Sequence, residues 1–160
     1  MVFDYVSCNL EVSRKKLDYK FTAKFLGNRG SIVVAVKDPM DFHKKIIGLI
    51  KEENLSTKQL EDLSHMMYDK IPGVVNANIF ITTLSNERAL GSVYYYKIET
   101  LGSTIGYMRV LKIETLHKGK FYKLETSSQM HDSPQAAEKK FNQIWPTFET
   151  AIKSFAFLPY

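Results

Sequence analysis

The 160 residues predict one α+β domain, in which a C-terminal helix packs on an antiparallel sheet. Three observations support this class. Apolar and polar residues alternate in several segments, as they do in half-buried strands. Hairpin-length links join the four strands expected after residue 74. A stripe of apolar residues at helical spacing closes the chain. The length is typical of one domain, and no linker or low-complexity segment divides residues 1–160.

The first predicted element is a β-hairpin. DYKFTAKFL at 18–26 alternates strictly, and GNRG at 27–30 is typical of a turn. The apolar run SIVVAVK after it predicts a strand buried on both faces. The residues before 18 can add an edge strand to this hairpin.

Two short helices are expected between residues 39 and 71, or one helix broken near Asn54. Asp38 can cap the first helix, and Pro39 suits its first position. The second begins with a capping-box pattern at 56–59. The expected buried residues are Phe42, Ile46, Ile47, Leu49 and Ile50 in the first helix and Leu60, Leu63, Met66, Met67 and Ile71 in the second.

A four-stranded antiparallel meander follows these helices. The strands are expected over 74–85, 88–100, 104–116 and 120–128. Short turns near 85–87, 101–103 and 117–119 link them.

Ser133 and Pro134 predict the cap and first position of the last helix. Pro146 falls inside this helix, so we expect a kink or a restart at Trp145. Its apolar stripe consists of Phe141, Ile144, Trp145, Phe148, Ile152 and Phe155.

A motif of Lys, an aliphatic residue, Glu and Thr occurs three times, in YKIET at 96–100, LKIET at 111–115 and YKLET at 122–126. We expect register pairs Leu116–Phe121 and Leu101–Thr104. The charges of all three copies then share one sheet face, with opposite charges set across from each other. Such pairs contribute a few tenths to about 1 kcal/mol each and fix the register. We interpret the motif as architecture, with a functional charged face as the alternative. The opposite face then carries Tyr94, Ile98, Tyr107, Leu111, Ile113, Tyr122 and Leu124.

The net charge of +5 is spread along the chain and mixed with acidic residues, which makes nucleic-acid binding an unfavoured function. No apolar run approaches the ~18 residues of a transmembrane helix. The start MVFDYVSC shows no secretory signal, so a cytoplasmic protein is expected, or a periplasmic or exported one whose leader has been removed. Cys8 is the single cysteine, which rules out an internal disulfide.

No catalytic group, metal site or cofactor is predicted. The four histidines lack the spacing of metal ligands. GxSxG and phosphate-loop motifs are absent.

One candidate ligand site lies between the sheet and the C-terminal helix. In the expected register Arg109 shares a face with Tyr94, Tyr96 and Tyr107, and Trp145 faces them from the helix. A buried guanidinium needs partners, which tyrosine hydroxyls or an acidic ligand can supply. Alternatively, Arg109 lies at the sheet margin with its stem on tyrosine rings.

A second candidate is the basic turn HKGKFYK at 117–123. Its residues His117, Lys118, Lys120 and Phe121 combine positive charge with an aromatic ring. Such a tip can contact an acidic partner, and a plain solvated hairpin is the alternative.

Three stretches carry a resemblance: GSIVVAVKDPMDFHKKI, KFYKLETSS and FNQIWPTFETAIKSFAF. Their order resembles the superfamily that joins PsbP, the extrinsic subunit of photosystem II, with the Ran-binding Mog-type protein and the bacterial DcrB-like proteins. The resemblance implies an αβα sandwich and a mostly non-enzymatic, accessory role. A helix-grip fold, in which the sheet wraps the last helix around a ligand, is the rival.

We therefore expect a non-catalytic interaction module, an accessory or docking subunit that binds a protein partner. The alternative is a small-ligand-binding protein with a pocket between the sheet and the C-terminal helix. Exposed edge strands also permit a homodimer by sheet extension.

Overall fold

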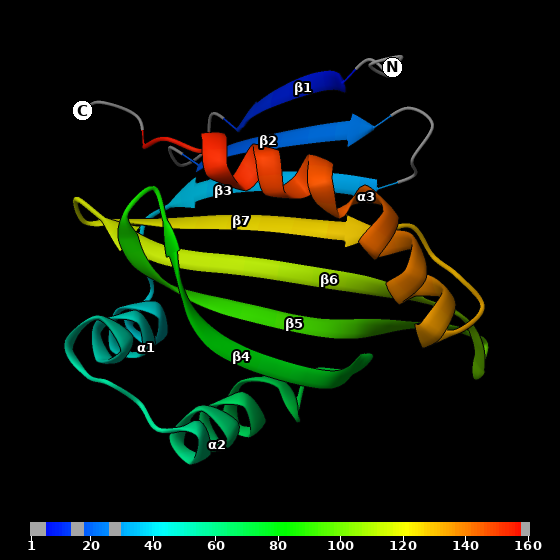
Figure 1. Cartoon of the computed structure of the whole chain (residues 1–160), viewed down its shortest axis with the longest axis horizontal. Helices are drawn as coiled ribbons and strands as arrows, with labels where there is room; N and C mark the ends of the chain where they lie inside the picture. Colours follow the sequence, from blue (N-terminus) through cyan, green and yellow to red (C-terminus); the bar gives the residue numbers. More distant parts are fainter. Residues whose placement is uncertain (1–5, 14–17, 26–29, 158–160) are drawn as a thin grey trace.

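The computed structural model describes the backbone of residues 6–13 and 18–25 and the whole of residues 30–157. These residues form an antiparallel sheet in the order β1-β2-β3-β7-β6-β5-β4, with three helices (Figure 1). The predicted α+β class is confirmed. The strands are β1 Val6–Ser13, β2 Asp18–Phe25, β3 Gly30–Lys37, β4 Val74–Leu84, β5 Glu87–Thr100, β6 Ser103–His117 and β7 Lys120–Ser128, and the helices are α1 Asp41–Glu52, α2 Thr57–Tyr68 and α3 Pro134–Ser154.

The N-terminal hairpin is present as predicted. β2 pairs with β3, and β1 adds an outer strand to β2. Most of the predicted GNRG turn lies outside the described residues. β3 is buried on both faces only in part, since Ile32 and Val36 are buried while Val33 and Ala35 are half-buried. β1 and β4 are the edges of this sheet, so a homodimer through an edge strand stays a prediction.

Helix α1 starts later than predicted. Its N-cap is Met40, whose backbone N–H donates to Nδ1 of His43 at 3.2 Å. Asp38 is therefore not the cap and Pro39 is not in the helix. Asp38 instead pairs with the ammonium of Lys120, at 2.6 Å, which ties the start of α1 to β7.

Helix α2 begins with the predicted capping box. Gln59 N–H donates to the Ser56 hydroxyl at 3.3 Å, and the Gln59 side chain accepts from Ser56 N–H at 2.8 Å. The two helices are separate, joined by residues 53–56. The predicted buried stripe was partly wrong, because α2 turns Leu63, Ser64 and Tyr68 inward. Phe42, Met66 and Ile71 are exposed.

The predicted meander β4–β5–β6–β7 is confirmed. Its links are two-residue turns in which both central residues have positive φ, as type I′ hairpins require. These turns are Ser85-Asn86, Leu101-Gly102 and Lys118-Gly119.

The β6–β7 register is the predicted one, with Leu116 opposite Phe121. The predicted β5–β6 register was wrong by one residue. Tyr95 is opposite Arg109, since a bulge leaves Ile105 without a partner residue between the Ile98–Gly106 and Glu99–Thr104 pairs. A shift of one residue moves a side chain to the other face of a sheet.

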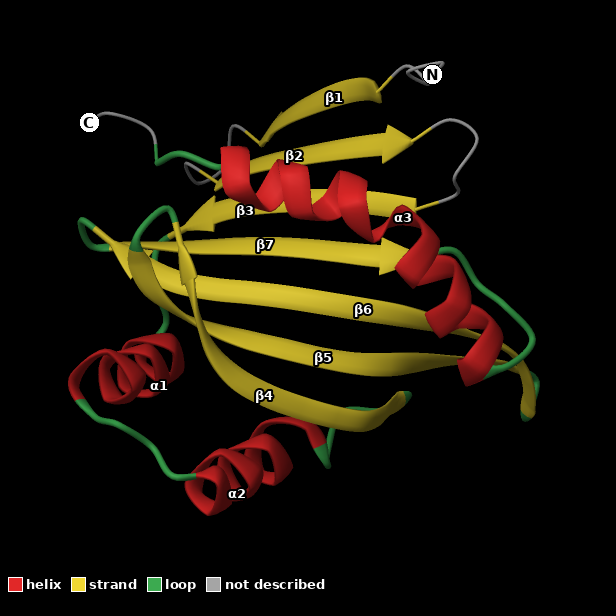
Figure 2. Ribbon diagram, in the orientation of Figure 1, coloured by secondary structure: helices red, strands yellow, loops and turns green. Residues whose placement is uncertain are grey.

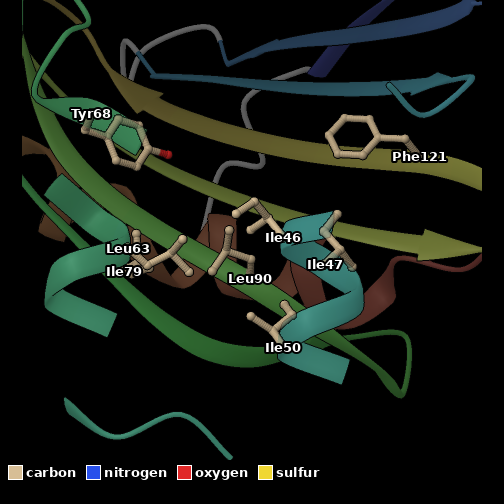
Figure 3. Packing of buried hydrophobic residues seen from close by; sticks show 8 residues of the cluster. All are labelled: Ile46, Ile47, Ile50, Leu63, Tyr68, Ile79, Leu90 and Phe121. Atoms are coloured by element: carbon tan, nitrogen blue, oxygen red, sulfur yellow. The ribbon is translucent and has the colours of Figure 1, made fainter. Parts of the chain in front are cut away.

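Helices cover both faces of the sheet, which gives an αβα arrangement. Ile47 and Ile50 of α1 and Tyr68 of α2 pack over Leu90 and its neighbours on one face (Figure 3). The full set in this cluster is Ile46, Ile47, Ile50, Leu63, Tyr68, Ile79, Leu90 and Phe121. On the opposite face, α3 packs its buried residues Phe141, Ile144 and Phe148 against Ile32 of β3 and Leu111 of β6.

Helix α3 begins as predicted, with the Ser133 hydroxyl accepting from Ala136 N–H at 3.2 Å. It continues through Pro146 without a restart. Its axis changes direction as it crosses the sheet (Figure 2), in keeping with the kink expected at a proline that lacks an N–H. Across the described ranges, no helix combines the length and apolar character needed to cross a membrane.

Candidate functional site

The second and third copies of the repeated motif share one sheet face and form a charge cluster, defined as Lys112, Glu114, Lys123 and Glu125. The predicted cross-strand order is confirmed, with Lys112 opposite Glu125 and Glu114 opposite Lys123. The ion pairs run along each strand: Lys112–Glu114 at 3.2 Å and Lys123–Glu125 at 3.1 Å. The first pair is buried, with side chains 15% and 9% exposed, whereas those of the second are 29% and 30% exposed.

The first copy of the motif lies on the other face, which corrects the expectation that all three copies align. Lys97 follows Tyr95 by two residues, so it shares the α3 face with Arg109. Its ammonium pairs with Glu99 at 2.6 Å. The bulge in the β5–β6 register is the reason for this exchange of faces.

Burial and neighbouring charges set the protonation states of Lys112 in the charge cluster and of Tyr94 on the same face. Burial alone would lower the pKa of Lys112, but the Glu114 charge and the Tyr68 hydroxyl raise it above its ordinary value. Burial, with a smaller effect of Glu125, raises the pKa of Tyr94. At neutral pH the amine therefore stays protonated and the phenol neutral, so neither is a nucleophile or base. This supports the architectural interpretation of these two copies.

A groove of about 270 Å³ lies between the sheet and α3, at the predicted place. Arg109 and Trp145 line it, as expected. The full lining is Phe80, Val93, Arg109, Leu111, Glu138, Phe141, Asn142 and Trp145.

The predicted tyrosines do not line this groove. Tyr94 and Tyr96 point to the opposite face, because Tyr95 is the residue opposite Arg109. Tyr107 shares the face of Arg109, but its backbone forms a bridge to His131, with N···O distances of 2.7 and 2.8 Å. The register difference therefore puts Tyr94 and Tyr96 on the face opposite the groove, and Tyr107 is not among the lining residues.

Tyr95 is the tyrosine that the sequence reasoning missed. Its ring centroid lies 4.4 Å from Cζ of Arg109, and its hydroxyl donates to Oε2 of Glu138 at 3.0 Å. Burial and this hydrogen bond raise the pKa of Tyr95. The alternative placed the Arg109 stem on tyrosine rings, whereas here the guanidinium itself lies over the Tyr95 ring. A glycine within a strand, here Gly106, is the sequence signal that points to a bulge.

Residues of the predicted docking turn make contacts within the chain, and its role as a docking surface stays a prediction. Phe121 is only 1% exposed and stacks on the His43 ring, with centroids 4.0 Å apart. Lys120 is held by Asp38. His117 bonds Glu87 at 3.0 Å. Of the four predicted residues, Lys118 alone is exposed.

Two hydrogen bonds stabilise the charged form of the Glu87 carboxylate that accepts from His117. Glu87 accepts from Lys51 Nζ at 2.8 Å as well as from the imidazole. These hydrogen bonds, that of Lys51 first, lower the pKa of Glu87. His117 also stacks on Phe157, with centroids 4.0 Å apart. The base of the hairpin is thus fixed to α1 and to the C-terminal segment.

A different apolar surface is exposed at the opposite end of β6. We define the apolar tip as Leu101, Ile105 and Met130, which are 100%, 48% and 46% exposed. Leu101 occupies the β5–β6 turn with φ of +51°, a conformation that L-residues with large side chains rarely adopt. Met130 lies against Gly106, because a Cβ on that glycine would meet its Cγ. The sequence predicted Leu101 at this turn, opposite Thr104, whereas Thr104 is opposite Glu99 and Leu101 is a central turn residue.

The described residues contain no group of three His, Cys, Asp or Glu side chains that could hold a metal ion. No family model matches this chain, and no curated protein matches it.

Proposed function

We propose that this chain is a non-catalytic docking module that binds a protein partner through the apolar tip. The observation that carries the proposal is Leu101, fully exposed in a left-handed turn position. This conformation costs an L-residue about 1–2 kcal/mol, and type I′ turns favour Asn-Gly instead. A leucine here opposes both local stability and solubility. A partner that covers the side chain gains the free energy of burying it, about 1.5–3 kcal/mol.

The chemistry of the tip favours an apolar pocket on a protein over an anionic membrane. Surface binding to anionic lipid needs an unpaired basic collar beside the apolar residues. On β5 the nearest cation, Lys97, is already paired with Glu99 at 2.6 Å. Exposed apolar side chains next to a neutralised ion pair resemble the centre of a protein interface, where anchors fill dry pockets.

Two further observations support a binding role over catalysis. Lys112 of the charge cluster stays protonated at neutral pH, and Tyr94 beside it stays neutral, so neither acts as a base. The element order also resembles the PsbP, Mog-type and DcrB-like superfamily, whose members include accessory subunits.

The test uses Leu101→Asn, which gives the hairpin its favoured Asn-Gly turn. A protein captured by the wild-type chain is purified, and its affinity is measured by titration calorimetry. We expect Leu101→Asn to raise the urea midpoint of unfolding while it weakens partner binding at least tenfold. Met66→Gln, which alters a residue 60% exposed on α2, is the control and should leave binding unchanged. Equal affinity of the wild type and Leu101→Asn would overturn the proposal.

A further inference from the structure

The groove beneath α3 joins an apolar floor to two opposite charges. Its apolar walls are Phe80, Val93, Leu111, Phe141 and Trp145. Arg109 and Glu138 supply one cation and one anion at the same groove. The volume, about 270 Å³, lies below the ~300–1,000 Å³ of sites for drug-sized molecules, so the ligand must be small.

Tyr95 fixes the spacing between the two charges. The Arg109 guanidinium stacks on its ring, with Cζ 4.4 Å from the centroid, and the Glu138 carboxylate accepts from its hydroxyl at 3.0 Å. The buried Tyr95 thereby holds the guanidinium over its ring face and the carboxylate at its hydroxyl. Ordered charges on rigid elements bind a ligand at lower entropic cost than mobile surface charges do.

Neither charge is neutralised by the other. Among the described residues, Arg109 forms no ion pair, and Glu138 has the Tyr95 hydroxyl as its hydrogen-bond partner. A half-buried guanidinium in a groove needs an anion, and the neighbouring carboxylate favours a cation. The amide of Asn142, also in the lining, can donate to or accept from either group of a ligand.

We propose that this groove binds a small zwitterion with an apolar side chain, a hydrophobic α-amino acid. Its carboxylate pairs with Arg109 and its ammonium with Glu138. Its side chain lies on Phe80, Phe141 and Trp145. A ligand with a carboxylate alone would place that charge near Glu138 unpaired, and a simple amine would meet Arg109 in the same way. This site is separate from the apolar tip, so it does not depend on docking.

The ligand test compares three molecules of similar shape on the purified full chain. They are L-phenylalanine, 3-phenylpropanoate, which lacks the ammonium, and 2-phenylethylamine, which lacks the carboxylate. Trp145 is the single tryptophan and lines the groove, so its fluorescence reports occupancy and calorimetry gives the affinity. We expect the zwitterion to bind at least tenfold more tightly than either analogue. Equal binding of all three, or none at millimolar concentration, would overturn the assignment.

Two variants test the role of each charge. Glu138→Gln keeps an acceptor for Tyr95 but removes the negative charge, so phenylalanine should bind at least tenfold more weakly and 3-phenylpropanoate more tightly. Arg109→Gln should weaken phenylalanine and favour the amine. Glu149→Gln, elsewhere on α3 and paired with Lys153, is the matched control.

The reversal of ligand ranking distinguishes charge recognition from loss of folding, since an unfolded variant would lose all three ligands. An unchanged ranking in both variants would refute the proposal. Leu101→Asn should leave phenylalanine binding intact, which separates this site from the docking surface.

Discussion

The charge cluster offers its own internal comparison, because β6 and β7 carry nearly the same motif at different depths. Glu114→Gln removes the carboxylate from a pair whose side chains are 15% and 9% exposed. The ammonium of Lys112 then remains buried, with the Tyr68 ring centroid 5.2 Å away. Removing one partner of a buried pair costs about 3–5 kcal/mol. We expect a loss of about 3 kcal/mol in the free energy of unfolding.

Glu125→Gln makes the same chemical change in the pair on β7. There the side chains are 29% and 30% exposed, so solvent screens the charge that remains. A loss of up to about 1 kcal/mol is expected. Urea unfolding followed by circular dichroism measures both variants. With a slope of about 2 kcal/mol/M, the midpoints should fall by about 1.5 M and at most about 0.5 M.

The double variant Lys112→Met/Glu114→Leu completes this test. Replacing both charges by apolar groups removes the unpaired ammonium, so stability should return close to that of the wild type. Equal midpoints for Glu114→Gln and Glu125→Gln would refute the argument that burial sets the effect of each pair. A double variant less stable than Glu114→Gln would refute the desolvation argument in particular.

Two other predictions concern packing and pH. Gly30→Ala should destabilise the protein by about 1–3 kcal/mol, because the new Cβ would lie 2.4 Å from Cδ1 of Ile144. Gly48→Ala, which meets nothing within 4 Å in a helix, should stabilise by about 0.5–1 kcal/mol, and thermal melts of the two should shift oppositely. Burial lowers the pKa of His43, so the unfolded chain binds this proton more readily. The contribution of neutral His43 to the free energy of unfolding is therefore complete above pH ~6.5, the pKa of the unfolded chain. It is lost as the pH falls through the lower pKa that His43 has in the folded protein. His43→Gln retains a side-chain acceptor like that of Gln59, so the stability difference between wild type and variant should shrink in acid; a pH-independent difference would contradict this.

Much of the fold is visible in the sequence because its signals are local. Turn residues and the alternation of apolar and polar residues predicted the positions of the hairpins. Capping residues predicted the starts of helices, and the capping box at Ser56 and Gln59 is present as expected. The start of α1 was misplaced because Asp38 is used by a residue far along the chain, Lys120. Local capping preferences cannot reveal a competing tertiary ion pair.

Two of the predicted residues line the candidate groove, and one β-bulge explains why the predicted tyrosines 94 and 96 do not. Arg109 and Trp145 line the expected groove, whereas Tyr95 takes the place assigned to its neighbours. The three consecutive tyrosines at 94–96 offer nothing to choose between the two faces. Only the unpaired residue Ile105 decides which tyrosine meets Arg109.

The sheet joins strands that are neighbours in the chain to strands that lie far apart in it. β4 to β7 pair with their neighbours in the chain, through three two-residue turns, so little loop-closure entropy opposes them. β3 pairs with β7 only after the chain has closed across both helices and the meander, as in Lys37 opposite Phe121. Contacts of such long sequence separation form slowly. We therefore expect the meander to act as a template, with the N-terminal strands added last along the exposed edge of β7.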